Sequence, residues 1–268
     1  MKKSLPAIAV TLALSGSLAR AAALKGLWTF DNPANLGQAT VGTNLAINGV
    51  APAYSATLAD DSAKSLSGVV TTVTGTGNGF TATHNIAPNG GGALVNDFSI
   101  LVDMFSPVTS RSSWRAIVQT TLANDEDADY FIRPDTDRIG TSSMTYSTTG
   151  IPEANWSRLV LTYHLDSVST NSTIKAYING TLFYNHAGTA DTDFLRDDRF
   201  ALQPTVLFFH DDDNENASLN IGALAIWDGV LTAGEVGNLG LAGAAVPEPS
   251  AGILAAVAGL GLMRRRRK

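Results

Sequence analysis

The clearest hydrophobic pattern in the chain lies near its middle. Apolar and polar residues alternate along 158–164 and again along 174–178, which is the period of a β-strand buried on one face. Asn179-Gly180 follows directly, and residues 181–184 form another β-favouring run. Asn and Gly tolerate the positive φ that a type I′ turn requires at both central residues. We therefore predict three consecutive antiparallel strands, the last two joined by a tight hairpin.

Weaker versions of the same pattern occur on both sides of this region, although residues 32–92 carry little signal. The other expected strands are residues 24–31, 53–58, 69–73, 97–105, 114–120, 128–133, 137–140, 205–209 and 218–227. They recur about every 8–15 residues between turn-forming segments, as in an all-β sandwich of two antiparallel sheets. The glycine-rich segments 75–79 and 89–92 are interpreted as turns, because neither carries the lysine of a phosphate-binding loop.

Composition agrees with an all-β fold and excludes several functions. The 268 residues include no cysteine, which excludes a disulfide framework, a thiolate metal site and a cysteine nucleophile. Eight of the 18 basic residues lie in the terminal segments, against one of the 24 acidic residues, so residues 24–245 carry a formal charge of −13. This acidity argues against nucleic acid as a partner and is compatible with cation binding.

Both ends of the chain carry targeting features. Residues 1–23 are interpreted as a secretory signal peptide, which is expected to form a helix. The features that indicate it are Lys2-Lys3, the apolar run 5–18 and small residues at the cleavage position. The apolar run is shorter than the ~20 residues of a spanning helix, which favours cleavage over a permanent anchor. This predicts export through the Sec translocon.

The tail, residues 246–268, combines three parts: a proline-containing motif, the apolar run 251–263 and a basic end. The motif is Val246, Pro247, Glu248 and Pro249, and the basic end is Arg264, Arg265, Arg266, Arg267 and Lys268. Basic residues stay on the cytoplasmic side of a membrane, so the preceding chain is expected to have crossed it. The apolar run is short for a stable span, which favours a short hydrophobic helix inserted transiently; a simple tail anchor is the alternative.

Two family resemblances follow from these segments. Residues 156–163 with 174–180 resemble the core of laminin-G-like, concanavalin-A-like jelly-roll domains, and the segments 24–31 and 97–105 extend the likeness. Residues 231–236 resemble the short helix that closes such domains, so a short helix is expected there. The resemblance implies one jelly-roll sandwich over residues 24–245 that binds glycans or extracellular partners, often with calcium. Fold likeness alone establishes none of these activities.

The tail resembles the PEP-CTERM sorting signal of exopolysaccharide-producing Gram-negative bacteria. That resemblance implies recognition by an exosortase, a membrane protease-transpeptidase that cuts near Pro247-Glu248-Pro249. It places the protein at the outer surface or in the extracellular matrix of such a bacterium.

No arrangement of residues for catalysis is found. The four histidines, His84, His164, His186 and His210, are scattered and are interpreted as strand-face or loop residues. There is no Gly-x-Ser-x-Gly motif, and no strand carries the closely spaced carboxylates of jelly-roll glycosidases. We therefore expect no catalytic residue.

Two acidic loops are candidate calcium sites. Residues 125–129 have alternating carboxylates but lack the glycine and the final glutamate of an EF-hand. The loop 210–216 offers hard oxygen ligands between two strands, and its candidate ligands are Asp211, Asp213, Asn214 and Glu215. The alternative is a solvated acidic turn with no metal.

Three functions remain open at this stage. The first is a non-catalytic exported module that binds glycan or matrix through its loops, with aromatic contacts from residues such as Trp114 and Tyr130. The second is a polysaccharide hydrolase or lyase on the same fold. The third is a structural component of the matrix with no discrete ligand.

Overall fold

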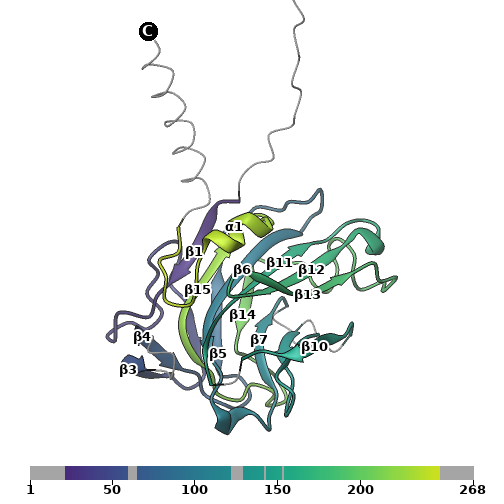
Figure 1. Ribbon diagram of the computed structural model, residues 1–268. Coiled ribbons are helices and arrows are strands. Elements are labelled where there is room, and N and C mark those ends of the chain that lie inside the picture. Colours follow the sequence, from purple (N-terminus) through teal and green to yellow (C-terminus); the bar gives the residue numbers. More distant parts are fainter. Residues whose placement is uncertain (1–21, 60–64, 122–128, 142, 153, 248–268) are drawn as a thin grey trace, which may run out of the picture.

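The computed structural model describes residues 22–59, 65–121, 129–141, 143–152 and 154–247. Within these ranges the chain is almost entirely β, with two antiparallel sheets and a single short α-helix (Figure 1). The predicted jelly-roll sandwich is therefore confirmed. The same ranges contain no helix that is long and apolar enough to cross a membrane.

The eight-stranded sheet has the order β13-β12-β11-β6-β15-β4-β3, and β1 also pairs with β15. Its strands are β1 (Leu24–Trp28), β3 (Ala53–Ala59), β4 (Ser65–Thr71), β6 (Asp97–Phe105), β11 (Trp156–His164), β12 (Thr173–Ile178), β13 (Thr181–Ala187) and β15 (Asn220–Trp227). β1 and β4 share one edge of β15 at its opposite ends.

The seven-stranded sheet has the order β10-β9-β8-β7-β14-β5-β2. Its strands are β2 (Ala46–Asn48), β5 (Gly79–Thr83), β7 (Arg115–Gln119), β8 (Asp129–Ile132), β9 (Arg138–Gly140), β10 (Tyr146–Gly150) and β14 (Thr205–Phe208). Two 3₁₀ turns, η1 (Val108–Ser110) and η2 (Ser169–Asn171), lie in the connections, and α1 (Ala233–Asn238) follows β15.

The main hydrophobic core lies between the two sheets, as strand alternation requires. On β11, Leu159, Leu161 and Tyr163 belong to this core, whereas Val160 belongs to a second cluster on the outer face of the eight-stranded sheet. The outer cluster also contains Val236 of α1. β11 is therefore buried on both faces, because α1 and the segment after it cover the sheet from outside.

The predicted hairpin is confirmed in its turn type as well as its position. Asn179 has φ 51° and Gly180 has φ 81°, so both central residues are left-handed. The Asn179 side-chain oxygen accepts from the Arg158 amide at 2.9 Å, and the Asn179 amide donates to the Arg158 carbonyl at 2.9 Å. The turn is thereby fixed to the neighbouring strand.

Several predicted boundaries differ from the structure. The first strand ends at Trp28 instead of reaching residue 31, because Phe30 adopts a left-handed backbone (φ 53°) that breaks the extended run. Four strands, β2 to β5, occupy the weakly patterned region 32–92, where small residues give little alternation. The predicted strands 53–58 and 69–73 correspond to β3 and β4, whereas β2 and β5 were not predicted. The short helix is confirmed and begins after Thr232, which forms a capping box with Glu235.

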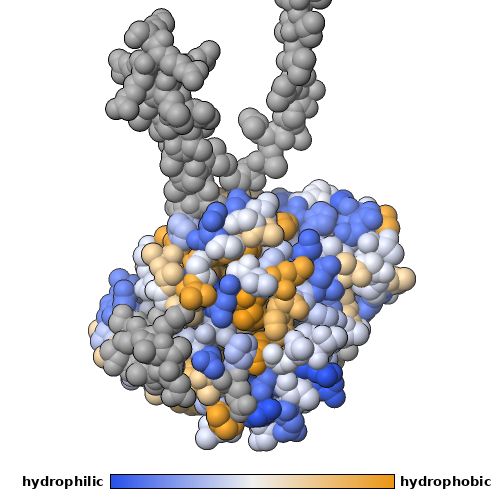
Figure 2. All heavy atoms as spheres, in the orientation of Figure 1, coloured by the Kyte–Doolittle hydropathy of each residue, from blue (hydrophilic) through white to orange (hydrophobic). Residues whose placement is uncertain are grey.

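A buried ion pair fixes the segment after α1 to the outer face of the sheet. Arg158 on β11 binds Asp103 on β6 through two parallel hydrogen bonds of 2.7 Å each, and both side chains are 1% exposed. The same guanidinium donates to the carbonyls of Leu239 and Ala244, and the Gly243 amide donates to Asp103. Figure 2 shows apolar side chains gathered on this face of the molecule, below α1.

The two ends of the described chain lie beside α1 and β1 (Figure 1). Ala22 is buried in the outer cluster, and Val246 packs against that cluster, whereas Pro247 is exposed. Most of the predicted signal peptide and most of the predicted tail, including Glu248, Pro249 and the basic end 264–268, lie outside the described residues.

Candidate functional site

The acidic loop, residues 210–216, connects β14 to β15 at one end of the sandwich. β14 ends at Phe208 because Phe209 is left-handed (φ 53°), and a second left-handed residue, Asn214 (φ 77°), turns the chain back toward β15. The loop is thus shaped by two residues with an unusual backbone. Such positions persist only where surrounding contacts fix them.

Asn216 is the main anchor of the acidic loop and is 1% exposed. Its side-chain oxygen accepts from the Gly75 amide at 2.9 Å. Its side-chain nitrogen donates to the carbonyls of Gly75, Asn78 and Phe209 at 3.0–3.3 Å. One buried amide therefore joins the loop before β5 to the acidic loop and holds both rigidly.

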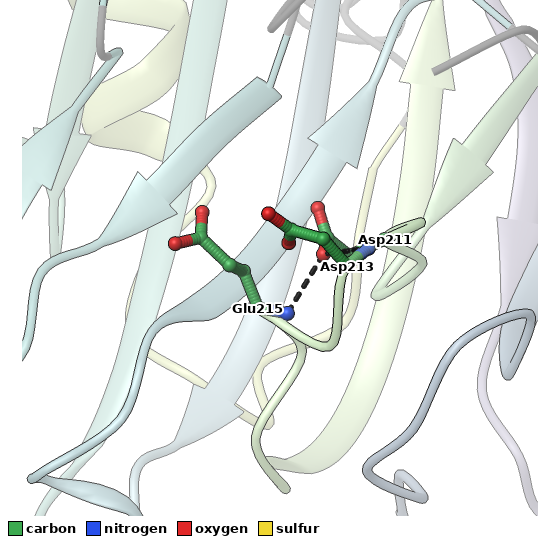
Figure 3. A group of neighbouring side chains, drawn as sticks. All are labelled: Asp211, Asp213 and Glu215. Carbon is green, nitrogen blue, oxygen red and sulfur yellow. Dashed lines mark hydrogen bonds between the residues drawn. The ribbon is translucent and has the colours of Figure 1, made fainter. Parts of the chain in front are cut away.

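Three of the four predicted metal ligands come together. Oxygen atoms of Asp211, Asp213 and Glu215 lie within 4.8 Å of one another, and Figure 3 shows their side chains projecting to the same side of the loop. Asp211 is 3% exposed, and its Oδ2 accepts from the amides of Asp213 (3.0 Å) and Glu215 (2.7 Å). The Asn214 side-chain oxygen is engaged elsewhere, accepting from the Thr76 amide and hydroxyl.

The geometry of these three carboxylates fits a calcium ion. Ca²⁺ binds oxygen ligands at about 2.3–2.6 Å, so two ligands of one ion are at most about 5 Å apart. The 4.8 Å spread of the cluster satisfies this limit without movement of the loop. The three residues could supply carboxylate ligands, and water would complete the 6–8 ligands that Ca²⁺ takes.

His210 precedes the cluster and is partly buried. Burial lowers the pKa of its imidazole, and the nearby carboxylates of Asp211 and Asp212 oppose this only in part. The side chain is therefore neutral at neutral pH and does not cancel the negative charge of the loop.

The two aromatic residues expected to contact a ligand differ in their placement. Tyr130 is fully buried in the core between the sheets, so its predicted role in binding is wrong. It lies on β8, where strand alternation points it inward. Trp114 is partly exposed, and its carbonyl accepts from the Ala217 amide directly after the acidic loop. Residues 125–128 of the other acidic loop lie outside the described residues.

A cavity that the sequence did not indicate is a second candidate site, and it lies where the edges of the two sheets meet. This side pocket has a volume of about 220 Å³ and is lined by β13 and the β9–β10 connection, among others by Ser143, Thr145, Tyr184, Asn185, His186 and Thr189. The sequence signal for it is weak. The alternation of β13 places Tyr184 and His186 on one face, but only the paired strands show that this face is the inner one.

Comparison with known proteins bears on the fold. No family model and no curated protein sequence matches the chain. Among solved structures, the binding domain of botulinum neurotoxin serotype D is 17% identical, with a TM-score of 0.51 over 81% of this chain and 50% of that one. The receptor-binding domain of botulinum neurotoxin type G is 14% identical, with a TM-score of 0.50 over 81% and 50%.

A further structure is domain 4 of a GH43 extracellular arabinanase from Geobacillus stearothermophilus, in complex with arabinotriose. It is 19% identical, with a TM-score of 0.47 over 82% of this chain and all of that domain. The chain spans about half the length of the neurotoxin domains that it matches. At these identities the likeness defines only a class of fold, the β-sandwich. Any activity has to be argued from the residues of the site.

Proposed function

We propose that this chain is a non-catalytic, laminin-G-like binding module that is exported to the outer surface or extracellular matrix of a Gram-negative bacterium. It binds a glycan or a matrix component, and calcium at the acidic loop stabilises that end of the sandwich. The observation that carries the proposal is the cluster of Asp211, Asp213 and Glu215 on a loop held rigid by Asn216. The neurotoxin neighbours, named as binding or receptor-binding domains, support a binding role for the fold.

Calcium binding is tested by thermal unfolding with added calcium and with a chelator. A ligand that binds only the folded state stabilises it by about 2.7 kcal/mol when present at 100 times its dissociation constant. We expect Asp213→Asn to abolish the rise in melting temperature. Asp212→Asn is the matched control, because Asp212 lies in the same loop but outside the cluster. A melting temperature that neither calcium nor chelator changes would remove calcium from the proposal.

Glycan binding is tested with the purified protein on a glycan array. Binding to a defined set of glycans supports the proposal, whereas binding to none favours a structural matrix component. The hydrolase or lyase alternative is tested by incubating the protein with polysaccharides and measuring reducing ends and unsaturated products. Turnover that disappears when one loop carboxylate is changed would establish an enzyme.

Sorting is tested in a host that has an exosortase. Pro247 is exposed directly after the packed segment that ends at Val246, which leaves this residue of the motif accessible to a protease. Replacing Pro247, Glu248 and Pro249 by alanine should cause the uncut precursor to accumulate in the inner membrane. Ser250→Ala, one residue further on, should be processed normally. Equal processing of both variants would contradict an exosortase-read motif.

A further inference from the structure

One wall of the side pocket is formed by polar side chains at positions of β13 that face the interior of the sandwich. β13 is the edge strand of its sheet, and its residues Tyr184 and His186 pair with Ala176 and Ile174. Those two partners face the main core, so Tyr184 and His186 face inward as well. Two polar aromatic side chains thus occupy inner positions of an edge strand, where apolar residues would pack equally well. Local exceptions of this kind concentrate at functional sites.

The opposite wall of the side pocket comes from the other sheet. The connection between β9 and β10 brings Ser143 and Thr145 to the same cavity. The Thr145 hydroxyl and the Tyr184 hydroxyl are hydrogen-bonded to each other, so the two walls are joined directly. The pocket is therefore formed by the edge strand β13 on one side and by the β9–β10 connection on the other.

Two polar atoms in this pocket lack a partner. The His186 Nε2 atom and the Ser143 Oγ atom are both buried and have no hydrogen-bond partner among the described residues. His186 is 4% exposed. An unsatisfied buried polar group costs about 1–3 kcal/mol, and native proteins rarely leave two of them in one place without a ligand or water. Both residues line the 220 Å³ cavity, but the two atoms themselves have less than 1 Å² of accessible surface, so a partner in the cavity reaches them only when the side chains rotate.

The chemistry of the lining restricts what that partner can be. None of the residues lining the pocket is charged, which disfavours a phosphate, a carboxylate or a cation. Burial lowers the pKa of His186 to about 4, so at neutral pH the imidazole offers one donor and one acceptor and no charge. The rings of Tyr184 and His186 are nearly perpendicular, with their centroids 4.4 Å apart. The volume lies below the roughly 300–1,000 Å³ of pockets for drug-sized ligands, which suits a single ring.

We propose that the side pocket binds one neutral sugar unit, whose hydroxyl groups hydrogen-bond to His186 Nε2 and Ser143 Oγ once these two side chains rotate toward the cavity, with Tyr184 beside its ring. This inference rests on the glycan-binding function proposed above and assigns that function a site separate from the acidic loop. Sugar binding at the side pocket therefore requires no calcium.

The test is an NMR titration of the isotopically labelled protein with glucose, galactose, xylose and arabinose, followed at Ser143, Thr145 and the His186 ring. We expect saturable shifts at these positions with at least one sugar. His186→Phe should weaken binding tenfold or more, and Ser143→Ala about 2–10-fold, as expected for the loss of one neutral hydrogen bond. His164→Phe, the same change at a histidine outside the pocket, should leave the affinity unchanged.

Folding does not obscure this test. Phe keeps a flat ring and removes a buried nitrogen that has no partner among the described residues, but its ring is larger, so urea unfolding of the variant checks that it folds. Absence of saturable shifts at the pocket with all four sugars would overturn the inference. So would a glycan from the array whose binding His186→Phe leaves intact and Asp213→Asn abolishes; glycan binding would then stand without the side pocket. Failure of every glycan to bind the wild-type protein would instead overturn the proposed function.

Discussion

Removing the carboxylate of Asp103 should destabilise the protein far more than removing any exposed charge. The Asp103→Ala variant leaves the Arg158 guanidinium buried without its counter-ion, and it removes the acceptor of the Gly243 amide. Breaking one side of a buried ion pair costs about 3–5 kcal/mol, because the remaining charge is no longer compensated. That is a large part of the roughly 5–15 kcal/mol of a typical domain.

A matched control lies on the same two strands. Asp97 and His164 also pair across β6 and β11, at 2.7 Å, but their side chains are 29% and 43% exposed. An exposed contact of this kind contributes about 0–1 kcal/mol, so Asp97→Ala should have a small effect. Both variants remove a carboxylate from the same pair of strands, and they differ in the burial of the pair, in its cation and in the hydrogen bond that Asp103 accepts from the Gly243 amide.

Urea unfolding monitored by tryptophan fluorescence measures both variants, and hydrogen exchange of the Gly243 amide reports on the segment after α1. We expect faster exchange at Gly243 in Asp103→Ala only. The double change Asp103→Leu with Arg158→Met should recover part of the loss, because an apolar pair avoids the desolvation of two charges. Recovery is incomplete because the carbonyls of Leu239 and Ala244 lose their donor. Equal small losses for Asp103→Ala and Asp97→Ala would refute the reasoning.

Two other predictions concern buried polar groups. The pKa of His186 falls from its usual 6.5 to about 4 on folding, so the unfolded chain binds the proton more tightly. Stability from this group is present above about pH 6.5 and is lost as pH falls toward 4, by roughly 2 kcal/mol between about pH 7 and pH 4.5. Urea unfolding at both pH values should show a smaller loss for His186→Phe than for wild type, and parallel losses would contradict the assigned protonation. Asn216→Ala should cost about 2–4 kcal/mol, since it leaves buried backbone groups of the two loops without partners. Asn214→Gly is the control, because glycine keeps the left-handed backbone and only the contacts to exposed Thr76 are lost, and thermal unfolding of the two variants should differ clearly.

Features that depend on neighbouring residues could be predicted from the sequence. The Asn179-Gly180 turn follows from backbone preferences at two positions, and the capped helix after Thr232 follows from a spacing of three residues. The carboxylates of the acidic loop are also close in sequence, so their clustering could be anticipated. In each case the interacting groups lie within one turn or loop.

Features that depend on how the sheets pair could not be predicted. Asp103 and Arg158 are 55 residues apart and meet only because β6 and β11 are neighbours in a particular register. Tyr130 is a residue type that is common in binding sites, but it is buried on the inner face of β8. The side pocket needs residues from both sheets, and its key residue, His186, is indistinguishable in sequence from a solvated strand histidine.

The direction of β15 has a practical consequence for measuring binding. The strand starts after the acidic loop and ends at Trp227, which pairs with Leu24 at the entry of the described chain. The strand has eight extended residues at roughly 3.3 Å each, so the acidic loop and the entry of the described chain are separated by about 25 Å along β15. Both described ends leave beside α1 and β1 (Figure 1). A protein coupled to a sensor chip or a bead at residue 22 or residue 247 therefore keeps its carboxylate cluster turned toward the solution.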